Sequence, residues 1–469
     1  MERISVSKVY IFLACMFGCL FILLVPPFQT PDEDSHFKRA YVISEGKFFP
    51  EVEDGRAGYY FSREICEYID KNQSNIGKLD SKYTFSEIIS KEQQPAVYND
   101  KEFVQFATMN TVWIGHIIPA FGICVGKLVS VLAGREPSVL FLLYFARAAN
   151  LLFYVACVSL SIRLTPILKR TFCMIGLMPM ALYIACSPSY DTLLLGATFV
   201  FSALTFHLLL DPDAKLKGKH LLLYSIIAFI YVILKIVYIP LFALLLFLPK
   251  KQYKKWEFLK KVGIFIALFV GIYFLMKLPT FFIESVSAGT NPRMSEQIQY
   301  VLKHPKAYLH IFYTTVKQLR GYYVASTIGL FGLVDTRMPD IFIYAYLFFA
   351  ILFGAVEVNE KEGLPVKWYH QVVVLFAVMA GVFGIYLAMY LFWTSVAPGG
   401  GVGVPWIDGV QGRYFIPFIP MLYLVFYNRH ISRMLGKRKI GQAVSDYGYM
   451  VSAVMLTISE VIVLLRFWV

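Results

Sequence analysis

Charged side chains are scarce in this sequence, at 16% of residues, while hydrophobic types reach 58% and the mean hydropathy is +0.60. An ordinary soluble chain carries about 25% charged and about 45–50% apolar residues. The shortage of charge excludes a soluble enzyme and a disordered protein. Because the apolar residues fall into runs of about 20, the composition indicates a polytopic membrane protein. The net charge of +13 is then mainly a topology signal, since the basic residues lie in short loops between apolar runs.

Recognisable cofactor and metal motifs are also missing. The seven cysteines form no C-x-x-C pair and no Cys/His spacing typical of a metal site, and only Cys66 lies in a long polar segment. No Gly-x-Ser-x-Gly, P-loop or dinucleotide-binding fingerprint is present. These absences exclude a secreted disulfide scaffold, and no nucleic-acid partner is expected.

The first apolar run and the polar segment after it predict the orientation of the chain. Arg3 and Lys8 precede the run Val9 to Val25, and no small-residue cleavage site follows, so we expect a retained first helix that starts in the cytoplasm. Residues 29–110 hold 15 of the 31 acidic residues against 10 basic ones. This segment is predicted to be extracytoplasmic and to fold over the membrane mouth.

The loops can be assigned to one side of the membrane from their charges, and the number of crossings between them then predicts two segments that are not simple transmembrane helices. The stretch 112–133 must enter and leave on the same face, as a re-entrant or surface-lying piece. The run 221–248 has basic residues on both flanks and is predicted to be a hairpin of two short helices with Lys235 at its outer tip, the alternative being one long tilted helix. The other predicted helices are 139–162, 171–187, 190–210, 262–283, 339–357, 368–394, 414–428 and 448–468.

The predicted fold is therefore an all-α polytopic integral membrane protein with about eleven crossings, N-terminus inside and C-terminus outside. Its predicted divisions are a first transmembrane helix (1–28), an extracytoplasmic loop with surface or re-entrant helices (29–138), a transmembrane bundle (139–283), a second large extracytoplasmic loop (284–338) and C-terminal transmembrane helices (339–469).

The sequence TPDED directly after the first helix is the first candidate for chemistry. Thr30 fits a helix N-cap and Glu33 the third helical position, which together predict a capping box. Helical spacing places Asp32, His36 and Arg39 on one face. The capping box alone can explain Glu33, but it does not require Asp32, and an acid at the lipid–water boundary is costly unless it faces a polar cavity.

Three further polar groups fall at the same predicted outer boundary. The turn SPSYD carries Asp191, which a helix N-terminus alone can explain. Lys235 has the alternative of a snorkelling lysine. The Gly-rich segment GGGVGVPWIDGVQGRYF ends at Arg413, which fits a phosphate-binding arginine, an ion pair with Asp408 or a snorkelling side chain.

Two acids and two cations at one depth suit a lipid-phosphate substrate. The cations can hold the phosphate and stabilise it as a leaving group, while a carboxylate takes the proton from an attacking hydroxyl. That chemistry is glycosyl transfer from a lipid-linked sugar.

The blocks PPFQTPDEDSHFKRAY, RAAN, LMPMALYIACSPSYD, LKIVYIPL and GVQGRYFIPFIP resemble, in this order, those of a bacterial membrane family catalogued as domain of unknown function 2142. The resemblance covers about residues 9–430. It implies a GT-C-like bundle, as in glycosyltransferases that use polyprenyl-phosphate-linked sugars, with a catalytic or metal-binding acid in the first outer loop. Here that loop holds Asp32 and Glu33. An Asp-Glu pair in place of Asp-x-Asp leaves metal dependence open, with Mg or Mn as the possible divalent cation at these two residues.

The sequence and the resemblance together predict an inverting glycosyltransferase at the outer face of a bacterial inner membrane, acting on a polyprenyl-phosphate-linked sugar donor and a glycan, teichoic acid or lipid acceptor. The alternatives are a lipid-linked glycan transporter or flippase and a polysaccharide polymerase or ligase. Asp32 and Glu33 are the predicted catalytic residues. The predicted substrate-binding residues are His36, Arg39, Tyr190, Asp191, Lys235, Tyr238, Asp408, Gln411 and Arg413.

Overall fold

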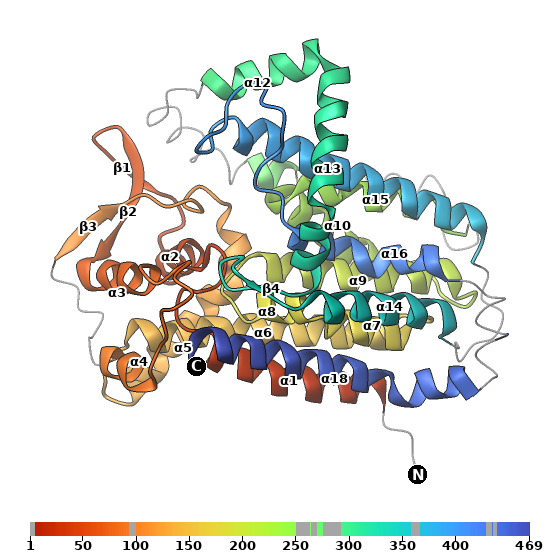
Figure 1. Ribbon diagram of the computed structural model, residues 1–469, viewed down its shortest axis with the longest axis horizontal. Coiled ribbons are helices and arrows are strands. Elements are labelled where there is room, and N and C mark those ends of the chain that lie inside the picture. The colour runs from red at the N-terminus through yellow and green to blue at the C-terminus, as the bar shows by residue number, and fades with distance from the viewer. Residues whose placement is uncertain are drawn as a thin grey trace.

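Long helices run side by side through most of the molecule (Figure 1). The computed structural model describes residues 5–92, 100–249, 263, 270–274, 292–357, 366–427, 434 and 439–469. In Figure 1, α1 (Val6–Leu24) lies beside α18 (Lys439–Phe467) and packs against α6 (Val139–Leu164). The helix α1 starts at one end of the bundle, and α18 ends at the other. The predicted helix 262–283 falls largely outside the described residues.

Apolar length confirms a polytopic, predominantly helical membrane protein. Six helical segments of the described chain are long and apolar enough to cross a membrane. They are Val6–Leu24, Trp113–Leu132, Val139–Leu164, Asp191–Leu210, Trp368–Thr394 and Tyr447–Phe467. Shorter apolar helical segments cover Gly218–Leu234, Ile236–Phe247, Asp340–Val356 and Gly412–Phe426. The number of eleven crossings stays a prediction.

Several predicted helices have breaks that the hydropathy pattern did not predict. The run 171–187 consists of α7 (Lys169–Gly176) and α8 (Pro179–Ala185), with proline at the first position of α8, where its missing N–H costs no hydrogen bond. The helix α15 (Trp368–Met389) continues into the π-helical turn η4 (Tyr390–Thr394). Elements that match their predicted ranges more closely are α9 (Asp191–Leu210) and α14 (Asp340–Val356).

The run 221–248 is a hairpin, as predicted, and not one long helix. The helix α10 (Gly218–Leu234) ends at Lys235, whose backbone is extended (φ −151°, ψ 92°), and the 3₁₀ helix η2 (Ile236–Phe247) follows. The two elements pack against each other.

The polar segment after α1 contains a small sheet that the all-α prediction missed. Strands β1 (Glu51–Glu53), β2 (Arg56–Ser62) and β3 (Lys101–Val104) are antiparallel in the order β1-β2-β3. Asp54 and Gly55 join β1 to β2 with φ values of 48° and 73°, the geometry of a type I′ hairpin turn. The sheet lies with α2 (Glu33–Ser44) and α3 (Arg63–Gln73) at one end of the bundle (Figure 1), which we call the sheet end.

The segment 112–133 packs at the sheet end. It forms η1 (Trp113–His116) and α5 (Ile117–Leu132), and α5 contacts mainly α6 and α2. Gly122 lies so close to α6 that a Cβ atom would come within 2.4 Å of the Phe145 carbonyl oxygen. Because Arg147 of α6 already reaches the last carbonyls of α1, α5 covers a part of α6 that extends past the end of α1. Because Trp113–Leu132 is also long and apolar enough to cross a membrane, the expectation that this segment enters and leaves on the same face stays a prediction.

Two helices and a short hairpin occupy the predicted second loop. They are α12 (Pro292–Lys303), α13 (Pro305–Ile328) and the strand pair β4 (Leu330–Phe331) and β5 (Thr336–Arg337). In Figure 1, α13 runs across the direction of the other long helices. One of its faces packs on the segment η5 (Gly412–Phe418), which continues into α16 (Ile419–Phe426).

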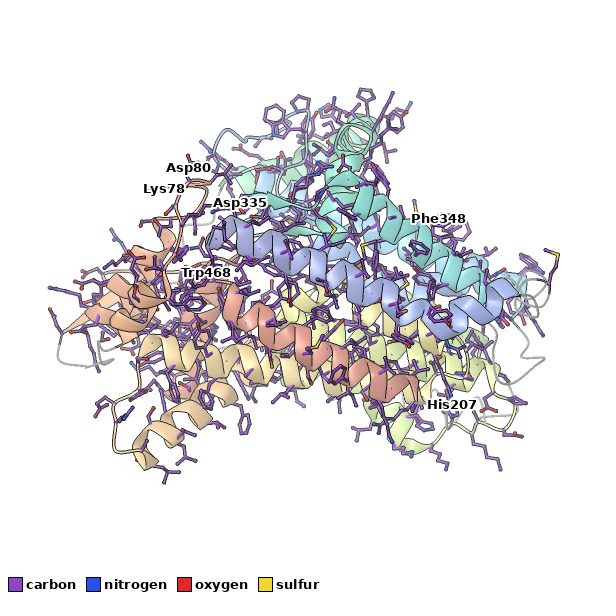
Figure 2. All side chains as sticks on the ribbon, turned by 60° about the horizontal axis from the view of Figure 1, so that its bottom comes forward. Lys78, Asp80, His207, Asp335, Phe348 and Trp468 are labelled. Carbon is purple, nitrogen blue, oxygen red and sulfur yellow. The ribbon has the colours of Figure 1, made fainter. Side chains whose placement is uncertain are left out.

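The C-terminal end of α18 contacts the C-terminal end of α1. The indole Nε1 of Trp468 donates a hydrogen bond to the carbonyl oxygen of Leu24 at 2.7 Å, and the ring of Phe85, in α4 (Phe85–Glu92), stacks on Trp468 at 4.1 Å. The guanidinium of Arg466 pairs with Asp335 at 3.0 Å. Figure 2 shows Trp468 and Asp335 on one side of the molecule and His207 on the other.

Candidate functional site

A buried ion pair fixes the loop that follows α1. The guanidinium of Arg147 donates to both carboxylate oxygens of Glu33, at 2.7 and 2.8 Å, and neither side chain is exposed. The same guanidinium donates to the carbonyl oxygens of Ile22, Val25 and Pro26. Arg147 therefore ties the end of α1 to the start of α2, and both oxygens of Glu33 are committed to this contact.

Asp32 stands immediately before α2 in a left-handed conformation, with φ 58° and ψ 17°. An aspartate at this position usually caps its helix from an extended backbone, but the Asp32 side chain makes no such bond. The helix starts at Glu33, and the predicted capping box is half formed. Glu33 Oε2 accepts a bond from the Thr30 N–H at 3.4 Å, but the Thr30 hydroxyl has no partner among the described residues. A left-handed backbone at a residue other than glycine is strained and is often found at functional sites.

The carboxylate of Asp32 pairs with Arg413, which lies 381 residues away in η5. Arg413 Nη2 donates to Asp32 Oδ2 at 2.8 Å. Partial burial raises the pKa of the Asp32 carboxyl, but the Arg413 guanidinium more than offsets this and leaves the pKa below its usual value. Asp32 is therefore an anion at neutral pH.

A second ion pair lies beside the first. Lys235 Nζ donates to Asp191 Oδ1 at 2.8 Å, which joins the hairpin tip to the first residue of α9. The turn before Asp191 is held by Asn150 of α6, whose amide donates to the carbonyl oxygens of Ser187 and Ser189 at 2.6 and 3.0 Å. The position of Asp191 is thus set by α6.

The ring of Tyr414 connects the two cations. Lys235 Nζ lies 4.2 Å from the centre of this ring, and the Arg413 guanidinium carbon lies 5.3 Å from it. The ring of Tyr190 is a second aromatic neighbour of Lys235, with its centre 5.4 Å from Nζ. The hydroxyl of Tyr238 donates to the Tyr414 backbone carbonyl at 2.8 Å and so fixes the residue that carries the shared ring. Cation–π contacts of this kind hold the cations in place without neutralising them.

Behind the ion pairs lie two buried histidines. His36 of α2 and His116 of η1 contact each other through Nδ1 and Nε2 at 2.8 Å, and His36 Nε2 lies 3.3 Å from the Ser189 hydroxyl oxygen. Ser189 Oγ in turn accepts a bond from the Asp191 backbone N–H at 3.1 Å. The two histidines, together with Ser189, therefore link the helix that follows Asp32 to the turn that precedes Asp191.

The other predicted substrate-binding residues lie apart from these pairs or form their frame. Arg39 is buried and donates to the Tyr59 hydroxyl and to the carbonyl oxygens of Phe48 and Thr111, so it anchors the sheet. Asp408 does not pair with Arg413 in the structure. Its Oδ2 accepts a bond from Trp393 Nε1 at 3.3 Å.

The Gly-rich segment is packed against α13 rather than free. The Gly412 N–H donates to the Ser326 hydroxyl at 2.8 Å, and a Cβ atom at Gly412 would meet the Thr327 backbone nitrogen at 2.3 Å. Only glycine fits this contact, which positions Arg413 next door. Gln411 precedes η5 as its first flanking residue, and its carbonyl oxygen accepts from the Tyr414 N–H.

The donor set does not fit a divalent cation at Asp32 and Glu33. Each carboxylate has a guanidinium as its partner, and both Glu33 oxygens face Arg147. A divalent cation needs several oxygen ligands and would be repelled by both arginines. Within the described ranges, no three His, Cys, Asp or Glu side chains are grouped to hold a metal.

Sequence reasoning missed four residues of this region: Arg147, Asn150, His116 and Tyr414. Arg147 and Asn150 had a usable signal, because two polar residues three positions apart in a long apolar helix usually face the protein interior. His116 and Tyr414 had none, because a single histidine or tyrosine beside an apolar run is common and does not by itself indicate a polar site.

Comparison with known proteins identifies one family. The family model described as "Predicted membrane protein (DUF2142)" matches residues 15–422. No curated protein and no solved structure matches the chain.

Proposed function

Because the chain belongs to the DUF2142 family of predicted membrane proteins, whose description names no activity, we propose its function from the site: transfer of one sugar from a polyprenyl-phosphate carrier to a cell-surface glycan, teichoic acid or lipid. The observation that carries the proposal is the juxtaposition of an exposed carboxylate, Asp32, with two cations that share the Tyr414 ring. A base and an anion-binding pair within one site are what transfer from a phosphate leaving group requires.

In the proposed reaction, Asp32 accepts the proton of the acceptor hydroxyl as its oxygen attacks the anomeric carbon of the sugar. The bond between that carbon and the phosphate oxygen breaks, and the phosphate leaves with the electron pair. Arg413 and Lys235 stabilise the leaving phosphate through charge-assisted hydrogen bonds. Attack opposite the leaving group inverts the anomeric centre. No step needs a metal ion held by Asp32 and Glu33.

The proposed orientation places the sheet end on the extracytoplasmic side of a bacterial inner membrane. The acidic segment 29–110 folds at this end, and short loops rich in lysine and arginine, such as the one with Lys215 and Lys217, lie at the opposite end of α9. Basic loops favour the cytoplasmic side. The sugar donor would therefore be a carrier already exposed at the outer face.

The test is transfer by the purified full chain from a labelled polyprenyl-phosphate sugar, with membrane extracts as the source of acceptors. The wild type should release the carrier phosphate and form a labelled product, and Asp32→Asn should form none while it folds normally. Asp34→Asn, two residues further in α2, is the matched control and should retain turnover. Movement of intact donor across a vesicle membrane without product would contradict the proposal and support a flippase.

A further inference from the structure

Three ion pairs at the sheet end differ in how deeply their partners are buried. The Arg147 and Glu33 side chains are both 0% exposed. The Lys235 and Asp191 side chains are 19% and 13% exposed. In the third pair the partners are unequal, since the Arg413 side chain is 4% exposed and that of Asp32 is 57% exposed.

This inequality decides which partner can move. The Arg413 guanidinium is held by the Tyr414 ring, and its backbone by the packing of Gly412 on α13. Asp32 has no cap bond to α2, and within the described residues its carboxylate is hydrogen-bonded to Arg413. If the pair separates, Asp32 moves into solvent and Arg413 stays.

A phosphate at this site competes with Asp32 for the same guanidinium. Carboxylate and phosphate oxygens both bind the guanidinium fork, and two anions on one cation repel each other. The four charged groups of the two pairs sum to zero, so an added phosphate leaves an excess negative charge unless one carboxylate withdraws. The exposed one withdraws at the lower cost, because water replaces its lost contact.

We propose that phosphate binding displaces Asp32 from Arg413, so that this ion pair acts as an exchangeable latch that opens only when the anionic ligand is in place. This inference rests on the proposed function for its ligand, a polyprenyl-linked phosphate. Once released, the carboxylate loses the cation that held its proton affinity down and becomes a stronger base. Donor binding would thus position the leaving group and also make Asp32 a better general base for the acceptor hydroxyl.

The latch predicts that removal of the Asp32 charge increases the affinity for phosphate. If Asp32 instead contacted the ligand favourably, the same change would decrease the affinity. If Asp32 competes with the phosphate, Asp32→Asn frees Arg413 and tightens phosphate binding. We expect the dissociation constant to fall by about 1.4- to fivefold, the range for an ion pair with one solvent-exposed partner. Arg413→Gln, which removes the shared cation, should weaken binding in both the wild-type and the Asp32→Asn background.

The experiment measures binding of a short-chain polyprenyl phosphate to the purified full chain in detergent, with the matching polyprenyl alcohol as the probe that lacks phosphate. Asp34→Asn is the control, and Asp32→Ser repeats the test with a second uncharged side chain if Asp32→Asn is unstable. Tighter phosphate binding with unchanged alcohol binding supports the latch. A second arm with inorganic phosphate separates the sources: tightening there as well assigns the effect to any phosphate anion, and tightening only with the polyprenyl phosphate assigns it to the lipid-linked ligand.

Equal or weaker binding by Asp32→Asn overturns the latch. The result is independent of turnover, so its failure is distinguishable from failure of the proposed function. If the wild type binds the phosphate and Asp32→Asn binds it more tightly, but the wild type transfers no sugar, the latch is kept and the transferase is rejected. Wild-type protein that binds neither phosphate probe would reject both.

Discussion

His36 Nδ1 lies 2.8 Å from His116 Nε2, and both rings are buried between the two elements that carry the acids of the site. A contact between two neutral rings needs one proton shared between them, whereas a second proton would introduce an unpaired charge into a buried space. The folded state therefore favours the neutral form of the pair.

Acid should loosen this contact. Burial lowers the pKa of His36 from 6.5 to about 4, with Arg413 and Lys235 adding to the effect and Asp32 and Asp191 opposing it. Between pH 6.5 and 4 the unfolded chain binds more protons at this position than the folded one, so stability falls as the pH falls through that window, by up to about 3 kcal/mol. Thermal unfolding in detergent at stepped pH should show this loss in the wild type.

The His36→Gln variant tests whether this ring is responsible. Its unfolding temperature should depend less steeply on pH across the same window, whereas the exposed His310 should give the wild-type slope when it is replaced by glutamine. Equal slopes for His36→Gln and the wild type would show that other groups titrate.

Glu33→Gln should act on folding rather than on chemistry. The change leaves the Arg147 charge buried without its counter-ion, which costs about 3–5 kcal/mol. We expect a lower unfolding temperature and a poor yield, measured against Asp34→Asn, whose carboxylate is partly exposed and 3.5 Å from Lys38. A Glu33→Gln variant with wild-type stability and no turnover would instead place Glu33 in the reaction.

Loss of either cation should weaken use of the donor. A charge-assisted contact to phosphate is worth about 1.5–3 kcal/mol, so Lys235→Ala should raise the donor KM by about ten- to a hundredfold. Arg413→Lys should also be impaired, because lysine cannot hold two phosphate oxygens at once. Steady-state kinetics with donor and acceptor varied separately should show an unchanged acceptor KM. Wild-type donor KM in both variants would mean that the phosphate binds elsewhere.

Removal of the Tyr414 ring should affect both cations together. Tyr414→Phe keeps the ring and should bind a polyprenyl phosphate nearly as the wild type does, whereas Tyr414→Leu loses two cation–π contacts of about 0.5–2 kcal/mol each. Binding titrations of the two variants separate the ring from the hydroxyl. If Tyr414→Leu also binds normally, the ring does not organise the cations.

Cysteine labelling should place the turn after α5 on the same side as the sheet. Arg135→Cys and Ser138→Cys should react with a membrane-impermeant reagent from the side that labels Glu51→Cys, because α5 packs on the part of α6 beyond the end of α1. Lys217→Cys, before α10, should react from the opposite side. Labelling of Arg135→Cys together with Lys217→Cys would mean that α5 crosses the membrane.

Hydropathy and charge predicted the helices well, because crossing a membrane imposes long apolar runs on the sequence itself. The hairpin at Lys235 followed from counting basic flanks, and the structure has its break at that residue. The sheet was missed because it is set by local turn chemistry and aromatic pairing within a segment that is mostly polar. The Asp54-Gly55 pair was the one local signal for it.

The site was predictable as a set of residues but not as a set of pairs. The predicted depth in the membrane grouped Asp32, Asp191, Lys235 and Arg413. The sequence does not indicate that Arg413 pairs with Asp32, or that Asp408 accepts a hydrogen bond from Trp393 instead. The role of Glu33 was equally hidden, since its partner Arg147 is 114 residues away. Pairings of this kind depend on tertiary packing, which a single sequence does not display.

The bond from Trp468 to the Leu24 carbonyl joins positions 444 residues apart. A ribosome that adds about 5–20 residues per second needs about 20 to 90 s to cover that distance. During this interval Asp32 is made and leaves the ribosome, while the contact that closes the bundle beside it is still missing. Synthesis therefore supplies this contact long after it supplies Asp32, and the proposed catalytic end of the protein is complete only once Trp468 has been made.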